Sequence, residues 1–364
     1  MPEKNRTYRA RIEGYTSEGL GVARIDGQAV FVHRALQGEE GDVLVLKVLK
    51  NAAFGKLSTL REVSPHRTEP DCPYYGRCGG CDFRHMDREE ELAAKRQRVQ
   101  DALRRIGGSD VTVEGISTDG QYLRYRNKSQ YPISADGTVG FYKARSHQVV
   151  EVPHCLLQKE QADDAAEALR QYIRTYGVSC YDEKTRRGLL RHLYIRTNQA
   201  GQSLICVLVN GKKLPHEPEL VSLLRQAVPE TVGVVLGVNT QPTGAILGGE
   251  YRTLWGEDVL TDRLCGLTFR LSVPSFYQVN HDMAEVLYRT ALDFAGLTGT
   301  ETVLDLYCGA GTITQVMARR AGRVIGAEIV PEAIEDARAN AQRNGVENVE
   351  FFCGDAAAAA ADFA

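Results

Sequence analysis

Long apolar stretches are absent from this sequence. A membrane-spanning helix needs about 18 or more consecutive apolar residues, and no such run occurs among the 364 residues. The opening segment, MPEKNRTYRARIEG, also lacks the apolar core of a signal peptide. The sequence therefore excludes a transmembrane helix and gives no sign of secretion, so we expect a cytoplasmic protein without a membrane partner.

The number and positions of the cysteines argue against an extracellular domain stabilised by disulfides. The chain has nine cysteines, an odd number, and three of them lie within residues 72–81. This distribution is typical of a protein in a reducing compartment that has one clustered cysteine site. The remaining composition, 43% hydrophobic and 25% charged, is that of an ordinary globular protein. A chain of this length predicts two or three domains.

The net charge of −3 indicates no overall attraction for a polyanion, but the charges are unevenly distributed. Residues 1–61 contain ten Lys and Arg against seven Asp and Glu, and residues 121–149 contain five against one. Residues 300–364 contain five against ten. A basic N-terminal part and an acidic C-terminal part are compatible with a nucleic-acid-binding face that the average conceals.

Changes of pattern along the chain predict three domains, and the predicted fold class is α/β plus β. Residues 1–63 alternate apolar and polar residues with frequent glycines, which predicts four or five short strands in an OB-like β-barrel. Residues 64–270 are rich in strands, with helices at 87–106 and 158–176, and predict a central, mostly antiparallel α+β domain. Residues 271–364 predict the first half of a Rossmann-like domain.

The barrel carries basic residues that favour RNA contact, since such barrels commonly bind single strands. The alternative is a barrel without a ligand. The basic residues are Arg6, Arg9, Arg11, Lys47, Lys50 and Lys56.

The C-terminal segment has the clearest order of elements. A helix is expected over 282–295, where Asp282 and Glu285 are spaced for a capping box. After it come ETVLDL, a glycine loop, TITQVMARRA, RVIGAE, a second helical segment and VEFFC, which predict β-α-β-α-β. Pro331 and Gly345 mark the start and the end of the second helix.

Cys72, Cys78 and Cys81 form the pattern C-x5-C-x2-C, and Cys155 is the best candidate for a fourth ligand. Thiolates this close together favour a metal or a cluster. Structural zinc sites usually use shorter spacings, so the five-residue gap favours a 4Fe-4S cluster held by thiolates. Zinc, or no metal at all, are the alternatives.

The segment VLDLYCGAGTIT predicts a cofactor pocket. It places Asp305 at the end of a strand, followed by Gly309, Gly311 and the start of a helix. The glycines let a ligand approach the backbone there, and Glu328, at the end of the next strand, is placed to accept hydrogen bonds from two ribose hydroxyls. Thr314 stands where dinucleotide-binding loops have a third glycine, which favours S-adenosylmethionine over a dinucleotide.

Two further residues in this part have open alternatives. Asp355, after the third strand, either contacts adenine or caps the helix that follows. Gln278, in SVPSFYQVN, either contacts a cofactor or belongs to a turn whose amides cap the next helix.

Five segments, taken in order, resemble one family. CPYYGRCGGCD, YRNK, GFYKARSHQVVEVPHC, SFYQVN and DLYCGAGT are similar to the RNA uracil-5-methyltransferases, and the N-terminal barrel resembles a TRAM domain. The similarity is greatest to the bacterial iron–sulfur branch that acts on 23S ribosomal RNA. It covers essentially the whole chain.

The resemblance implies an S-adenosylmethionine-dependent, monomeric enzyme that forms 5-methyluridine at a single-stranded or locally unfolded site of RNA. In this family the target uridine is flipped out, a cysteine thiolate adds to carbon 6, carbon 5 takes the methyl group, and a base removes the carbon-5 proton. The resemblance assigns Cys72, Cys78, Cys81 and Cys155 to a 4Fe-4S cluster, Gln278, Tyr307, Glu328 and Asp355 to S-adenosylmethionine, and Arg124, Arg126 and Lys128 to RNA.

The family's nucleophilic cysteine lies in a late Ser-Cys-Asn-Pro-type segment, and its Asp-Pro-Pro-Arg-type segment and glutamate base also lie late. None of these occurs in the 364 residues. We therefore expect a C-terminally truncated chain, inactive alone, whose nucleophile and base lie beyond its end. Cys308 and Cys353 match family positions that are not nucleophiles.

Two other functions stay open at this point. One is an RNA-binding fragment with a structural cluster and no catalysis, which predicts salt-sensitive RNA binding. The other is a nicotinamide-dependent oxidoreductase with an electron-transfer cluster. Thr314 and the absence of a second nucleotide motif argue against the oxidoreductase.

Overall fold

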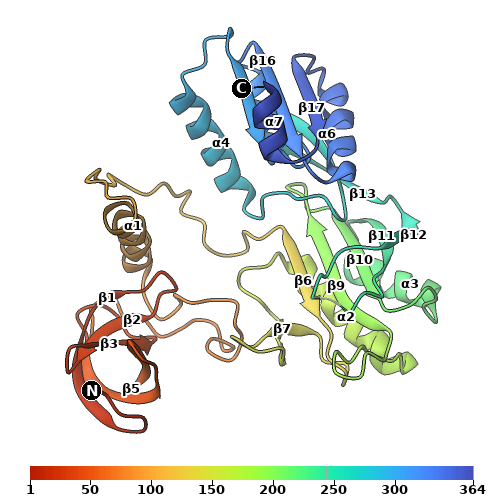
Figure 1. Ribbon diagram of the computed structural model, residues 1–364. Coiled ribbons are helices and arrows are strands. Elements are labelled where there is room, and N and C mark those ends of the chain that lie inside the picture. The colour runs from red at the N-terminus through yellow and green to blue at the C-terminus, as the bar shows by residue number, and fades with distance from the viewer. Residues whose placement is uncertain (243, 364) are drawn as a thin grey trace. The chain divides into compact units, whose positions relative to one another are not determined.

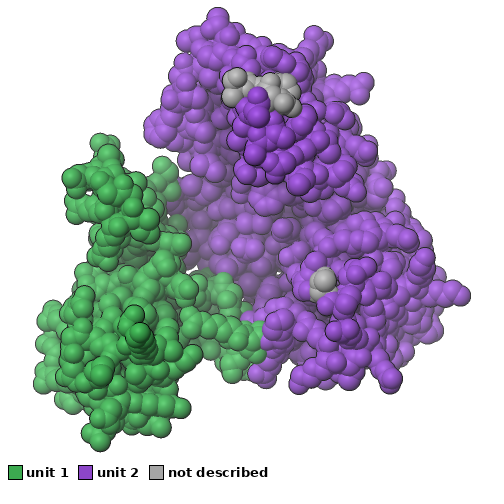
Figure 2. All heavy atoms as spheres, in the orientation of Figure 1, with its two compact units in different colours: residues 1–117, 143–146 green, residues 118–142, 147–364 purple. Residues whose placement is uncertain are grey.

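The computed structural model describes residues 1–242 and 244–363, and the chain divides into two compact units (Figures 1 and 2). Unit 1 comprises residues 1–117 and 143–146, and unit 2 comprises residues 118–142 and 147–364. Within the described residues, no helix combines the length and the hydrophobicity needed to cross a bilayer. The predicted domain boundaries at residues 63 and 270 stay predictions.

The first part of unit 1 consists of β1 (Thr7–Tyr15), β2 (Gly21–Ile25), β3 (Gln28–His33), β4 (Glu40–Val48) and β5 (Ala52–Glu62). They close into a barrel in the order β1-β2-β3-β5-β4 (Figure 1), with β3 and β5 parallel. The alternating pattern places Val30, Val32, Val43 and Val45 in the barrel core, where all are fully buried. The predicted β-barrel is confirmed.

The second part of unit 1 is the loop that carries three cysteines, followed by helix α1 (Arg88–Arg105). Arg67, near the start of the loop, donates to the buried carboxylate of Glu39, with 2.7 Å between Nη2 and Oε2. Helix α1 begins where the sequence predicts, because the Asp87 carboxylate accepts a hydrogen bond from the Glu90 backbone N–H (2.9 Å).

The first part of unit 2 consists of strands β6 (Lys128–Pro132), β9 (Leu190–Thr197), β10 (Ser203–Val209), β11 (Thr231–Val238) and β12 (Glu250–Gly256), the hairpin β7 (Gly140–Tyr142) and β8 (Val149–Glu151), and helices α2 (Glu160–Tyr176) and α3 (Glu217–Ala227). The five-stranded sheet has the order β12-β11-β10-β9-β6, and only β10 and β11 pair in parallel. Helices α2 and α3 pack against one face of it. The prediction of a mostly antiparallel sheet is confirmed, but α3 and β12 were not predicted.

The last part of unit 2 consists of hairpin β13 (Val259–Leu264) and β14 (Leu267–Ser272), strands β15 (Thr302–Leu306), β16 (Arg323–Glu328) and β17 (Val349–Cys353), and helices α4 (His281–Ala295), α5 (Thr312–Ala318), α6 (Pro331–Asn344) and α7 (Ala356–Phe363). β15, β16 and β17 form a parallel sheet in that order (Figure 1). The predicted β-α-β-α-β order is confirmed. Strands β13 and β14 pair with each other in a separate two-stranded antiparallel sheet.

The predicted capping box of helix α4 is wrong. The side chain of Asn280, not Asp282, caps the helix by accepting a hydrogen bond from the Met283 N–H (3.2 Å). The Glu285 carboxylate accepts instead from the backbone N–H of Cys265 (2.7 Å). The Glu285 carboxylate therefore bonds to the β13–β14 turn and not to the start of its own helix. A local sequence pattern does not reveal such a contact between distant residues.

Candidate functional site

The predicted cofactor residues gather at one edge of the three-stranded sheet. In a parallel sheet the carboxyl ends of the strands lie at the same edge, and the register pairs Leu306 with Ala327 and Glu328 with Cys353. Tyr307 directly follows β15, and Glu328 is the last residue of β16. Tyr307 and Glu328, two of the residues predicted to bind the cofactor, therefore lie at the same edge of this sheet, and their binding role stays a prediction.

The glycine loop between β15 and α5 needs its glycines for two different reasons. Gly309 (φ 55°) and Gly311 (φ 73°) both have left-handed backbone. A Cβ on Gly311 would lie 3.0 Å from the ring of Phe351 and 3.1 Å from the Cβ of Ala337, whereas a Cβ on Gly309 would meet nothing within 4 Å. Gly311 thus allows close packing, and Gly309 leaves open space beside the backbone.

Glu328 is held in place by three backbone N–H groups. Its Oε1 accepts hydrogen bonds from Ile329 (2.8 Å) and Val330 (3.1 Å), and its Oε2 accepts one from Gly309 (3.2 Å). A carboxylate has capacity for about four hydrogen bonds. Glu328 therefore joins the glycine loop to the end of β16 and keeps acceptor capacity for a ligand.

Asp305, in strand β15, has a hydrogen-bond partner in the helix that follows the glycine loop. Its carboxylate accepts a hydrogen bond from the hydroxyl of Thr314, in helix α5. Burial raises the pKa of Asp305, against the opposing effect of the Thr314 hydrogen bond. The arrangement fixes the strand end to the helix, and it explains why a threonine suits position 314.

Exposed side chains with apolar surface follow the ends of β15 and β16, and two of them, Ile329 and Val330, were not predicted from sequence. Tyr307 is 77% exposed, with a left-handed backbone (φ 72°) and its N–H bonded to the Ala327 carbonyl (2.8 Å). Ile329 and Val330 directly follow Glu328 and are 65% and 45% exposed. The sequence signal that could have identified them is a pair of apolar residues directly after an acidic residue at the end of a strand. Together these side chains offer apolar surface beside a hydrogen-bonding carboxylate.

Asp355 caps helix α7, because its carboxylate accepts a hydrogen bond from the Ala357 N–H (2.8 Å). Of the two roles predicted for Asp355, the structure shows the helix cap, and a contact with adenine stays a prediction.

The loop that carries Gln278 is fastened to the central sheet. The side-chain amide of Asn127 donates to the Gln278 carbonyl (2.9 Å), and the Asn127 N–H donates to the Val279 carbonyl (2.9 Å). The buried guanidinium of Arg196 donates to the Ser275 carbonyl (2.6 Å). In the described part of the chain, no hydrogen bond joins the Gln278 side chain to Glu328 or Asp305. Its cofactor role stays a prediction.

The four predicted cluster ligands divide between the units. Cys72, Cys78 and Cys81 belong to unit 1, and Cys155 belongs to unit 2. Across residues 1–242 and 244–363, no group of three or more His, Cys, Asp or Glu side chains is arranged to hold a metal ion. Thiolates are suitable iron ligands, and the 4Fe-4S cluster stays a prediction.

Arg124, predicted to hold RNA, has internal partners. Its Nη1 donates to the carbonyls of Cys155 (2.7 Å) and Gln158 (3.0 Å) and to the Asp163 carboxylate (2.9 Å). These bonds fix the Cys155 segment to helix α2. Contacts of Arg124, Arg126 and Lys128 with RNA stay predictions.

The cysteine of the glycine loop lacks the properties of a nucleophile. Cys308 is 5% exposed, and burial, with the nearby charges of Asp305 and Glu328, raises its pKa to about 12. Thiolate, not thiol, is the nucleophilic form. Cys308 therefore stays protonated at physiological pH.

Known families match both ends of the chain. A TRAM domain matches residues 3–58, and a methyltransferase domain matches residues 297–363. A protein of Clostridium tetani named uncharacterized RNA methyltransferase is 42% identical over 357 residues, which are 97% of this chain and 78% of that protein. A protein of the same description from Halalkalibacterium halodurans is 41% identical over 358 residues, with the same two shares.

A solved structure has a similar fold over most of the chain. The tRNA (uracil-54, C5)-methyltransferase of Pyrococcus abyssi, in complex with S-adenosyl-L-homocysteine, matches 95% of this chain and 79% of its own with a TM-score of 0.75. The sequence identity is 23%, so the likeness establishes a shared fold. With a TRAM barrel, a methyltransferase domain and relatives above 40% identity over nearly its whole length, this chain belongs to the RNA methyltransferase family.

Proposed function

We propose that this RNA methyltransferase forms 5-methyluridine and that its substrate is 23S ribosomal RNA. The observation that carries the proposal is the carboxylate of Glu328, bonded to three backbone N–H groups at the carboxyl edge of a parallel sheet. The shared fold with a uracil C5 methyltransferase supports the choice of base. The choice of ribosomal over transfer RNA rests on the resemblance of the five sequence segments to the iron–sulfur branch of the family.

The proposed cofactor is S-adenosylmethionine, which when bound would supply an electrophilic methyl group. Glu328 would accept hydrogen bonds from the ribose hydroxyls, and the open backbone at Gly309 would let the ligand approach. Tyr307 and Ile329 would cover its apolar surfaces. Asp305, Gly311, Gln278 and Asp355 complete the proposed set; the first two act by shaping the loop.

The proposed chemistry needs a thiolate nucleophile and a base in addition to these residues. Cys308 is disfavoured by its raised pKa, and Cys353 is exposed at the end of β17. We assign neither the nucleophile nor the base to a described residue.

A 4Fe-4S cluster on Cys72, Cys78, Cys81 and Cys155 is a further proposal from the resemblance, with a structural role. Iron and sulfide analysis of anaerobically purified protein, with its visible absorbance spectrum, tests it. Protein without iron but with one equivalent of zinc would favour the zinc alternative.

The decisive experiment measures the product in RNA. The product of the complete gene is incubated with methyl-labelled S-adenosylmethionine and with unmodified 23S ribosomal RNA or unmodified transfer RNA, and the nucleosides are separated after digestion. We expect labelled 5-methyluridine in ribosomal RNA. Label in transfer RNA alone would correct the substrate, label in another nucleoside would refute the proposed reaction, and salt-sensitive RNA binding without any label would favour the RNA-binding alternative.

A further inference from the structure

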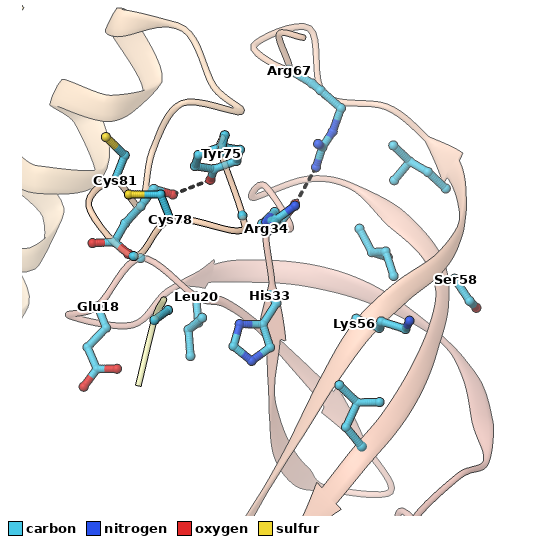
Figure 3. A pocket seen from close by; sticks show the side chains of 18 of the residues that line it. Glu18, Leu20, His33, Arg34, Lys56, Ser58, Arg67, Tyr75, Cys78 and Cys81 are labelled. Carbon is cyan, nitrogen blue, oxygen red and sulfur yellow. Dashed lines mark hydrogen bonds between the residues drawn. The ribbon is translucent and has the colours of Figure 1, made fainter. Parts of the chain in front are cut away.

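Unit 1 contains a cavity between the barrel and the cysteine loop (Figure 3). Its volume is about 650 Å³, which lies within the range of about 300–1,000 Å³ typical of small-molecule sites. One wall is formed by the end of β3 and by residues 56–60 of β5, and the other by Tyr75, Cys78, Cys81 and their neighbours. No residue proposed to bind the methyl donor lines it.

Among the described residues that line the cavity, three are cationic, Arg34, Lys56 and Arg67, and two are acidic, Glu18 and Asp82. Arg67 is paired with Glu39, but neither Arg34 nor Lys56 forms an ion pair with any residue in the described ranges. Figure 3 shows Lys56 on the barrel side of the cavity and Arg34 close to Tyr75 of the cysteine loop. Of the two acidic residues, Glu18 forms an ion pair with Arg145 (2.8 Å), and burial raises the pKa of Asp82 in the cysteine loop. The two free cations therefore favour an anionic ligand near β3 and β5.

Arg34 is held in a fixed position by the cysteine loop. Its guanidinium lies 4.9 Å from the centre of the Tyr75 ring. The Tyr75 hydroxyl is fixed in turn by donation to the Asp82 carbonyl (2.8 Å) and by a hydrogen bond with His85 Nδ1 (2.6 Å). A Cβ on Gly76 (φ 80°) would lie 1.5 Å from Arg34 Nη2, so only glycine allows this close approach. The loop thus orients a cation before a ligand arrives.

The rest of the cavity wall suits a flat, largely apolar group. Leu20, Leu57 and Leu60 line it together with the ring of His33. Burial, with the charges of Arg145 and Arg34, lowers the pKa of His33, so the ring is neutral at physiological pH. A ligand with an anionic part and an aromatic part matches this combination, and each unit of a nucleic-acid strand has both.

We propose that this cavity binds one nucleotide of the RNA substrate, other than the uridine that is methylated, with its phosphate at Arg34 and Lys56 and its base against His33 and the leucines. The inference rests on the proposed function only in taking RNA as the substrate. It also gives the cysteine loop a role in RNA binding, because that loop positions Arg34. Lys56 is also one of the barrel residues named from sequence. Three others, Arg6, Arg9 and Arg11, instead form ion pairs with Glu3, Glu40 and Glu62.

The test is the affinity of the whole chain for a fluorescein-labelled single-stranded oligouridylate RNA, measured by anisotropy at several salt concentrations. We expect Lys56→Ala and Arg34→Ala each to weaken binding about tenfold, as for a lost hydrogen bond to a charged group. Each should also reduce the slope of log affinity against log salt by about 0.7. Lys56 is exposed and serves as the second variant in case Arg34→Ala loosens the loop.

The matched control is Lys4→Ala, which removes the same charge from an exposed position of unit 1 outside the cavity. Equal weakening by Lys4→Ala and Lys56→Ala would overturn the proposal, because it would show general charge attraction. Uridine monophosphate binding as tightly as the oligonucleotide would also overturn it, in favour of a free nucleotide. S-adenosylmethionine affinity should be the same in all variants, so failure of this site is distinguishable from failure of the proposed function.

Discussion

Glu328 is the residue on which the proposed cofactor site depends most directly. Replacing it with glutamine keeps the size of the side chain but removes the negative charge that accepts hydrogen bonds. Because hydrogen bonds to charged groups contribute about 1.5–3 kcal/mol, we expect Glu328→Gln to weaken S-adenosylmethionine binding by tenfold or more. Isothermal titration calorimetry of the 364-residue chain measures this directly.

The matched control for that variant is Glu335→Gln in helix α6. Glu335 is exposed, and its replacement by glutamine removes the same charge from the same part of unit 2. Its affinity for S-adenosylmethionine should equal that of the unaltered protein. Equal affinities for all three proteins would show that Glu328 does not bind the ribose.

Cys308 and Cys353 lie near the same sheet edge but should differ in reactivity. The Cys308 thiol is buried with its pKa raised to about 12, whereas Cys353 is exposed. The thiolate reacts with alkylating agents, so iodoacetamide at mildly alkaline pH should label Cys353 well before Cys308. Mass spectrometry of tryptic peptides over time measures both rates in one sample. Faster labelling of Cys308 would reopen its candidacy as the nucleophile.

At the scale of elements, the loop from β15 to α5 contains two left-handed glycines, Gly309 and Gly311, and the end of α6 contains one, Gly345. Gly345 ends α6 with φ 63° and has open space around it, so Gly345→Ala should cost only the left-handed backbone, about 1–2 kcal/mol. Gly311 has a similar φ, but its added Cβ would crowd Phe351 and Ala337. Gly311→Ala should therefore be more destabilising, by about a further 1–3 kcal/mol.

Urea unfolding of the two variants gives the comparison, because the difference between them isolates crowding from backbone strain. Equal losses of stability would mean that the loop relaxes around the new methyl group. In that case the close packing of Gly311 would not determine the shape of the cofactor loop.

The elements that could be predicted from sequence are those fixed by local pattern. Pro331 and Gly345 bound helix α6 as expected, and the parallel strands place Tyr307 and Glu328 at one edge because strand direction determines that edge. Features that depend on distant residues were not predicted. The hydrogen bond from the Asn127 side chain to the Gln278 carbonyl joins residues 151 positions apart. Asn280 caps helix α4 in place of the predicted capping box, because the Glu285 carboxylate accepts a hydrogen bond from the Cys265 N–H.

At the scale of the whole molecule, each unit contains a buried histidine that resists protonation. His85 in unit 1 and His192 in unit 2 are 2% and 8% exposed, and burial, with a nearby arginine, lowers the pKa of each to about 4. In the unfolded chain both should titrate at about 6.5. Between these values the unfolded state binds more protons than the folded state, so stability falls as pH falls through this window.

We therefore expect the free energy of unfolding to decrease between about pH 6.5 and pH 5, with each histidine contributing at most about 1.4 kcal/mol per pH unit. His192→Gln removes one titrating group at a position where the ring Nδ1 has no hydrogen-bond partner among the described residues. Urea unfolding of both proteins across this range should give a shallower pH dependence for the variant. An unchanged dependence would mean that His192 is protonated in the folded protein, which would require an acidic partner or water that reaches the central sheet. A shallower dependence would place part of the acid sensitivity of the molecule in unit 2, away from the nucleotide cavity proposed in unit 1.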